Sequence, residues 1–77
     1  MIIKYRESAG VITLINTDKV EFIYLMETDE NQYSINITVA QNTELEIINY
    51  ENIEDRDLAF KKICNGFKQN ESFIDLT

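Results

Sequence analysis

The residues best able to do chemistry gather in the segment METDENQYSIN, residues 26–36. Three acids stand there between two apolar runs: Glu27, Asp29 and Glu30. Oxygen ligands at alternate positions begin the commonest kind of calcium loop, which then needs a glycine at its sixth position and an acid at its twelfth. Counted from Asp29, those positions hold Ser34 and Ala40. We therefore expect no metal site, and we interpret the segment as a solvated hairpin tip.

The usual catalytic groups are scarce in this chain. It has no histidine, the commonest general base and a frequent zinc ligand. Two glycines, Gly10 and Gly66, cannot build a phosphate-binding loop. The single cysteine, Cys64, lies in a predicted apolar helix stripe, so we expect a small core side chain rather than a nucleophile. Glu44 and Glu46 alternate on a predicted strand as solvated acids do. We expect neither an enzyme nor a bound cofactor.

The charge of the chain is unevenly distributed. The net charge is −7, and no lysine or arginine occurs between residues 20 and 55, where nine acids lie. An acidic field repels nucleic-acid phosphates and anionic lipids. Direct binding to nucleic acid or to a membrane surface is therefore disfavoured, and a protein partner with a basic surface is favoured.

The elements that would position these residues are mostly strands. Alternation of apolar and polar side chains predicts five of them: Ile2–Tyr5, Val11–Asn16, Lys19–Glu27, Tyr33–Ala40 and Glu44–Tyr50. Short polar turns between them predict antiparallel neighbours in a meander. The segment Lys19–Glu27 carries apolar residues on both faces, so we expect it to be a central strand.

The period changes near residue 52, where a helix is predicted over residues 53–69. Asn52 is the expected N-cap, with acids in the first turn and lysines in the later turns. An apolar stripe follows helical spacing: Ile53, Ala59, Phe60, Ile63, Cys64 and Phe67. In the C-terminal segment, residues 70–77, Ser72–Leu76 could add a short strand. We predict a single α+β domain over residues 1–77, with an antiparallel sheet of about five strands and the helix packed on one face.

The termini and the cysteine bear on the cellular compartment. A lone cysteine forms no intramolecular disulfide, which favours a reducing compartment for so small a domain. The N-terminus lacks the basic and apolar regions of a signal peptide. The apolar runs are far shorter than the roughly 20 residues that span a bilayer. We expect a cytoplasmic protein.

Binding is the function class that remains, and it points to three groups of residues. The first two are acidic: Glu27, Asp29 and Glu30 at the tip, and Glu51, Glu54 and Asp55 near the helix start. The third is apolar side chains that the predicted core does not use: Ile23, Leu25 and Leu58. Charge would steer the encounter with a partner and the apolar side chains would hold it. Each group also has a plainer interpretation, because acids keep small proteins soluble and single exposed leucines are common.

Two functions stay open at this point. Carboxylates at alternate strand positions lie about 6.6 Å apart, a spacing that suits a basic groove made for a nucleic-acid backbone. The chain would then be an inhibitor or nucleic-acid mimic of the phage or mobile-element type, blocking a basic nucleic-acid-handling protein. The alternative is a self-associating, homo-oligomeric structural domain. Steep salt dependence of binding distinguishes the first from the second.

Overall fold

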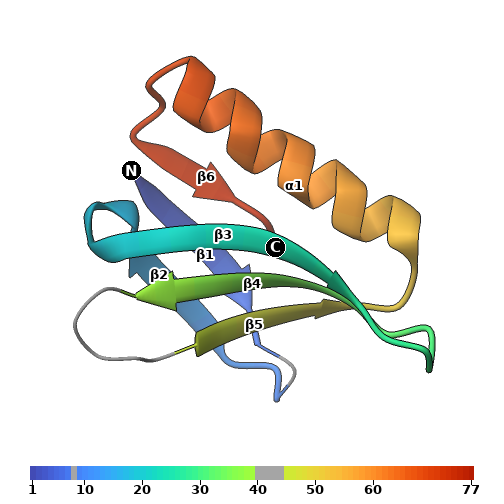
Figure 1. Ribbon diagram of the computed structural model, residues 1–77. Coiled ribbons are helices and arrows are strands. Elements are labelled where there is room, and N and C mark those ends of the chain that lie inside the picture. Colours follow the sequence, from blue (N-terminus) through green and yellow to red (C-terminus); the bar gives the residue numbers. More distant parts are fainter. Residues whose placement is uncertain (8, 40–44) are drawn as a thin grey trace.

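The computed structural model describes residues 1–7, 9–39 and 45–77. Its elements are β1 (Ile2–Arg6), β2 (Ile12–Asn16), the 3-10 turn η1 (Thr17–Lys19), β3 (Val20–Glu27), β4 (Tyr33–Val39), β5 (Leu45–Tyr50), α1 (Ile53–Lys68) and β6 (Phe73–Asp75). Two three-stranded sheets have the strand orders β2–β1–β6 and β3–β4–β5, and α1 lies beside them (Figure 1). The α+β class is confirmed, but the single five-stranded meander is wrong. The predicted turn at residues 41–43, with Ala40 and Glu44, lies outside the described residues.

The meander is broken at η1. The Asn16 side chain accepts a hydrogen bond from the Asp18 N–H at 3.0 Å and so caps a turn of 3-10 helix. Both the N–H and the hydroxyl of Thr17 donate to the Met1 carbonyl oxygen, at 2.9 and 3.0 Å. A tight hairpin would have returned β3 alongside β2. This anchored turn instead directs β3 away from β2 and into the second sheet.

The last strand, β6, returns to the beginning of the chain. It pairs in parallel with β1, with Ile3 opposite Ile74 and Lys4 opposite Asp75. The Leu76 N–H donates to the Lys4 carbonyl oxygen at 2.8 Å. The short final strand is therefore confirmed, and it completes the first sheet rather than extending a meander.

One hydrophobic cluster joins the two sheets and the helix. Its most buried side chains come from four elements: Ile3 and Tyr5 of β1, Ile35 and Ile37 of β4, Ile48 of β5 and Ile63 of α1. The period-two pattern correctly places Ile35 and Ile37 on one face of their strand, and both are fully buried. The described strands thus surround a shared core, which α1 covers by packing against β4, β5 and β6.

An asparagine stands just before the helix and another follows its end. The Asn52 Oδ1 atom accepts from the Asp55 N–H at 2.8 Å, so the N-cap is confirmed. At the other end Asn70 has a positive φ of 54°, and the Glu71 N–H donates to the Gly66 carbonyl oxygen at 2.9 Å. This pattern ends a helix with its last carbonyls satisfied. No helix in the described part of the chain is long and apolar enough to cross a membrane.

The inward side of α1 differs from the predicted stripe. Cys64 is exposed and Phe67 is half-exposed, whereas Gly66 is buried. A Cβ atom on Gly66 would lie 2.9 Å from Cγ1 of Ile74 in β6, closer than such atoms approach. The glycine therefore lets β6 pack directly against the helix. The helix faces the core with Ile63, and the partly buried Ala59 and Phe60 pack against that core, so this part of the predicted stripe is confirmed. The expectation that Cys64 is a core residue is wrong.

Candidate functional site

The structure brings the two predicted acidic groups to one end of the molecule. In the β4–β5 pair, Tyr33 lies opposite Tyr50, so the β3–β4 tip and the β5–α1 junction are neighbours (Figure 1). We call this region the acidic end, and its six predicted site residues are all exposed: Glu27, Asp29, Glu30, Glu51, Glu54 and Asp55. Two segments that are separate in the sequence therefore lie at the same end of the molecule, although Asp55 also borders a hollow that it shares with Lys62 and Asp75.

The tip itself is a tight hairpin turn. The Thr28 N–H donates to the Gln32 carbonyl oxygen at 3.0 Å, and the Asn31 N–H donates to the Thr28 carbonyl oxygen at 3.1 Å. Asn31 adopts a φ of 59°, a left-handed conformation that asparagine tolerates. The interpretation of this segment as a hairpin tip is confirmed. Among the described residues, no three acidic or cysteine side chains are arranged to hold a metal ion.

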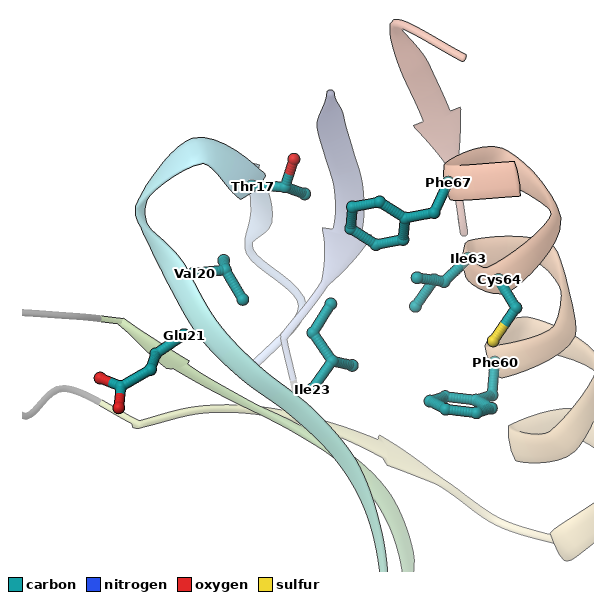
Figure 2. A pocket seen from close by; sticks show the side chains of 8 residues that line it. All are labelled: Thr17, Val20, Glu21, Ile23, Phe60, Ile63, Cys64 and Phe67. Atoms are coloured by element: carbon teal, nitrogen blue, oxygen red, sulfur yellow. The ribbon is translucent and has the colours of Figure 1, made fainter. Parts of the chain in front are cut away.

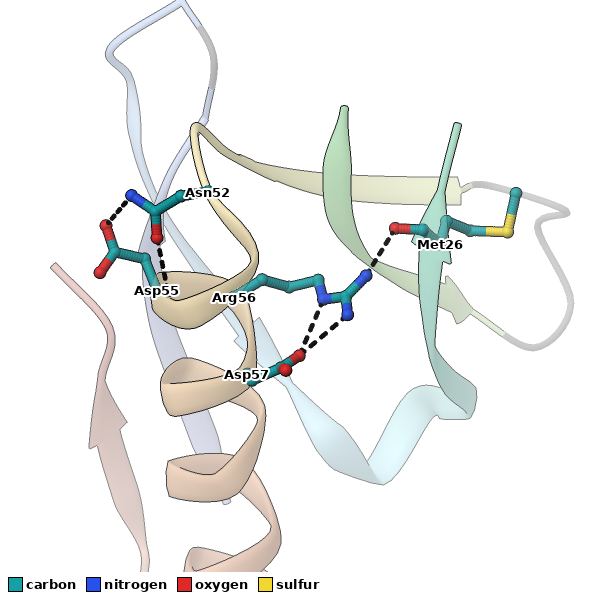
Figure 3. Close-up of polar contacts among 5 residues, drawn as sticks. All are labelled: Met26, Asn52, Asp55, Arg56 and Asp57. Carbon is teal, nitrogen blue, oxygen red and sulfur yellow. Dashed lines mark hydrogen bonds and ion pairs between the residues drawn. The ribbon is translucent and has the colours of Figure 1, made fainter. Parts of the chain in front are cut away.

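Arg56 connects the two halves of the acidic end (Figure 3). Its side chain is only 6% exposed, and its Nη1 donates to the Met26 carbonyl oxygen at 3.0 Å. Its Nε and Nη2 donate to Asp57 Oδ1 at 3.0 and 2.9 Å. Its Cζ atom lies 5.6 Å from the centre of the Tyr33 ring, within cation–π distance. The guanidinium thus holds the start of α1 against the end of β3.

The burial of Arg56 also shapes the charge of the surface. It is the only lysine or arginine between residues 20 and 60, and it points inward. Residues 20–60 therefore contribute exposed carboxylates to this surface but no exposed lysine or arginine. Arg56 was not singled out in the sequence analysis. Its position as the one basic residue in a long acidic stretch was the feature of the sequence that could have indicated a structural role.

Among the described side chains from Phe22 to Met26, Ser34 to Thr38 and Ile47 to Asn49, those on the outer face of the β3–β4–β5 sheet are all uncharged. Registers across the strands place these outward residues together: Phe22 and Thr38, then Tyr24, Asn36 and Ile47, then Met26, Ser34 and Asn49. We call this the uncharged face. Phe22 is 61% exposed, and Tyr24, Met26 and Ile47 are exposed too. Ser34 and Asn36 are buried between them, and the Ser34 hydroxyl donates to Asn36 Oδ1 at 2.8 Å.

A β-bulge at Glu21 explains why the sequence misassigned the faces of β3. The register advances by two residues on β3, from Val20 to Phe22, while β4 advances by one. Val20 and Ile23 consequently both pack against the core, although strict alternation would separate them. The sequence predicted that the core would not use Ile23. In the structure Ile23 is partly buried and packs against the core. β3 is also an edge strand rather than a central one.

The other two predicted apolar site residues are exposed. Leu25 follows Ile23 on β3 and is exposed near the acidic end. Leu58, at 69% exposed, is turned to solvent on α1. The structure does not bring the three apolar residues into one patch, because Leu58 projects from a different side of the helix than the residues that face β3.

Between β3 and α1 lies a groove of about 400 Å³ that the sequence did not predict. Figure 2 shows side chains from both elements pointing into it. We call it the β3–α1 groove, and its lining is mostly apolar: Thr17, Val20, Glu21, Ile23, Phe60, Ile63, Cys64 and Phe67. It exists because α1 packs mainly on β4, β5 and β6, which leaves the inner side of β3 partly uncovered.

The buried Tyr5 and the partly buried Tyr50 lie in different polar environments. The Tyr5 hydroxyl donates to Glu46 Oε2 at 3.0 Å, so Glu46 faces inward and is not the solvated acid that its strand position predicted. Burial, followed by this hydrogen bond, raises the pKa of Tyr5. The Tyr50 hydroxyl is buried without a hydrogen-bond partner among the described residues. Burial, and then the charge of Asp55, raises the pKa of Tyr50.

Comparison with known proteins gives no relative for this chain. No family model matches it, and neither the curated proteins nor the solved structures include a match.

Proposed function

We propose that this protein is a small, non-catalytic protein-binding domain whose acidic end engages a basic surface of its partner. The observation that carries the proposal is the convergence of two acidic groups around a buried arginine. Six exposed carboxylates face solvent there, and the Arg56 guanidinium is turned inward. Such a field attracts a basic protein and accelerates the encounter.

The specific form of this function that we propose is inhibition by mimicry of a nucleic acid. A nucleic-acid-handling protein has a basic groove that accepts a row of phosphates, and a rigid row of carboxylates can occupy it. The hydrogen bonds of Arg56 to Met26 and Asp57 support the proposal, because they hold the acidic end in one shape. The type of protein is that of small phage or mobile-element inhibitors that act in the cytoplasm.

The test compares two variants of equal net charge. Asp29→Asn with Glu30→Gln removes two charges from the acidic end. Asp18→Asn with Glu71→Gln removes two exposed charges elsewhere, so both variants go from −7 to −5. Each protein is used to capture basic nucleic-acid-binding proteins from the native host, and association rates are then measured at low and high salt.

We expect the acidic-end variant to associate more slowly with the captured protein at low salt, and the control variant to behave like the wild type. The difference should shrink at high salt because screening weakens long-range attraction. Equal association rates for the two variants would contradict the proposed role of the acidic end.

Self-association is the second candidate, and the uncharged face favours it. A chain of net charge −7 can approach its own copy most easily where it carries no charge, and Phe22, Tyr24 and Met26 are exposed there. Sedimentation velocity over a range of concentrations tests this. A dimer that Phe22→Ser dissociates and Leu58→Ser leaves intact would support self-association, whereas a monomer at all concentrations would exclude it.

A further inference from the structure

We propose that the β3–α1 groove binds an extended segment of a partner protein, which pairs with β3 as an additional strand and carries apolar residues followed by lysine or arginine. This binding mode rests on the proposed function, because it names the kind of segment that the protein partner presents. It concerns the β3–α1 groove, which adjoins the acidic end at Glu27 and contains none of the other five carboxylates.

In the described structure the backbone of β3 has a free edge that can pair with another strand. β3 is the longest strand, with eight residues, and in the described part of the chain it pairs with β4 alone. In Figure 1 it lies between β4 and α1, so its free edge is on the side of the helix. An unpaired edge offers backbone N–H and C=O groups to another strand. Proteins commonly recognise extended peptides by adding them to such an edge.

The side chains around the groove offer apolar surface to such a strand. Ile23 of β3 points toward Phe60 and Phe67 of α1 across the groove (Figure 2). Phe67 is 49% exposed and Cys64 is exposed, so apolar surface on the helix remains open to solvent. An extended peptide directs every second side chain to one face. A volume of about 400 Å³ is within the range of about 300–1,000 Å³ typical of ligand sites.

Charge identifies the chemistry of the segment. Glu21 is the one charged residue among those that line the groove, and its carboxylate points away from α1 (Figure 2). Along β3 the strand continues to Leu25 and Glu27, and Asp57 of α1 lies nearby, since it shares Arg56 with Met26. A segment that runs along β3 thus meets apolar side chains and then carboxylates. Apolar residues followed by a cationic residue complement this order.

A second copy of this chain suits the edge less well than a basic segment. If two β3 strands paired antiparallel, the Glu21 end of each would lie beside the Glu27 end of the other. Like charges placed opposite each other on neighbouring strands are destabilising. The acids near both ends of β3 therefore favour a positively charged segment over a second copy of β3.

The experiment uses the full chain and a displayed library of short random peptides as the probe. Peptides enriched on the wild type are synthesised, and their affinities are measured for Phe67→Ser, Cys64→Arg and the matched control Leu58→Ser. All three positions are half-exposed or exposed on the same helix, and circular dichroism checks that each variant is folded. Each peptide is also made with backbone N-methyl groups at alternate residues, which removes strand hydrogen bonds.

We expect enriched peptides to alternate apolar residues and to contain lysine or arginine. Loss of a central apolar contact should weaken binding by about tenfold or more in Phe67→Ser, and Leu58→Ser should bind like the wild type. N-methylation at one set of alternate residues should also weaken binding. The inference is overturned if no peptide is enriched, or if enriched peptides bind both groove variants and the N-methylated forms unchanged. A dimer that Phe67→Ser dissociates would assign the groove to a second copy and overturn it as well.

The same variants separate this inference from the proposed function. If the protein captured from the host loses affinity for the acidic-end variant but not for Phe67→Ser or Cys64→Arg, the acidic end stands and the groove inference fails. If the peptides bind the groove as expected while the two charge variants bind the captured protein equally, the groove stands and the proposed function fails.

Discussion

The Nη1 atom of Arg56 donates a hydrogen bond to the Met26 carbonyl oxygen at 3.0 Å, between residues that are 30 positions apart in the sequence. This contact ties the first turn of α1 to the end of β3. It keeps the segment of the β3–β4 tip beside the start of α1, so the shape of the acidic end depends on one buried cation.

Replacing Arg56 should destabilise the protein. Hydrogen bonds to charged groups contribute about 1.5–3 kcal/mol each, so we expect Arg56→Ala to lower the free energy of unfolding by about 2–3 kcal/mol. Arg56→Lys keeps the charge but loses the planar fork and should have a smaller effect in the same direction. Urea unfolding followed by circular dichroism measures both. Lys61→Ala, at an exposed site on the same helix, should change the free energy by about 0.5 kcal/mol at most.

Gly66→Ala should be destabilising although alanine favours helices. At an exposed helix site this change would stabilise by about 1 kcal/mol. Here the new Cβ would collide with Ile74, and such overpacking typically costs about 1–3 kcal/mol. We expect a lower melting temperature for Gly66→Ala and an equal or higher one for the exposed control Asn65→Ala. Adding Ile74→Val removes one colliding atom, so the double variant should show less than the summed loss of the single ones.

Tyr5 and Tyr50 should respond oppositely to removal of the hydroxyl at neutral pH. Tyr5→Phe loses the hydrogen bond to Glu46 and should lower the free energy of unfolding by about 1.5–3 kcal/mol. Tyr50→Phe removes a buried hydroxyl that has no partner in the described structure, so it should be neutral or stabilising. Denaturant unfolding of both variants at one pH tests the contrast. A large loss for Tyr50→Phe would reveal a partner for that hydroxyl.

Alkaline pH should destabilise the folded protein. Burial raises the pKa of both Tyr5 and Tyr50 in the fold, whereas an unfolded tyrosine titrates near about 10. Above that pH the unfolded chain binds fewer protons than the folded one, so the free energy of unfolding falls as pH rises. The stabilisation is complete below about pH 10 and is lost above it. Unfolding measured from neutral pH to above 10 should show this decline, and Tyr5→Phe should reduce its slope.

The acids of the tip should contribute little to stability. Glu27, Asp29 and Glu30 are exposed, and the hydrogen bonds of the turn come from Thr28, Asn31 and Gln32 instead. Each neutralisation, Glu27→Gln, Asp29→Asn or Glu30→Gln, should change the free energy of unfolding by no more than about 0.5 kcal/mol. Thermal unfolding of the three single variants checks this, and a collapse in any of them would give that acid a structural role.

Local features were predictable because neighbouring residues determine them. Asn52 caps the helix through its own side chain, and Asn70 ends it by adopting a left-handed conformation. The alternation of Ile35 and Ile37 correctly gave the buried face of β4, and the tip was correctly interpreted as a turn. The two acidic groups were also recognisable as exposed, although nothing local said that they would meet.

Tertiary structure alone decided how these elements combine. Strand pairing between β1 and β6 joins the two ends of the chain, and no local pattern specifies such a partner. Glu21 is an extra residue in β3. Because this bulge shifts the two-residue period, the residues after it that face the core are not the ones that strict alternation from Val20 predicts. Arg56 is buried because β3 approaches the start of α1, where the guanidinium binds the Met26 carbonyl oxygen. Gly66 is buried because β6 packs against the end of α1 at Ile74. Composition and periodicity determined which segments form strands and helix, whereas the acidic end and the β3–α1 groove arise from contacts between segments far apart in the sequence.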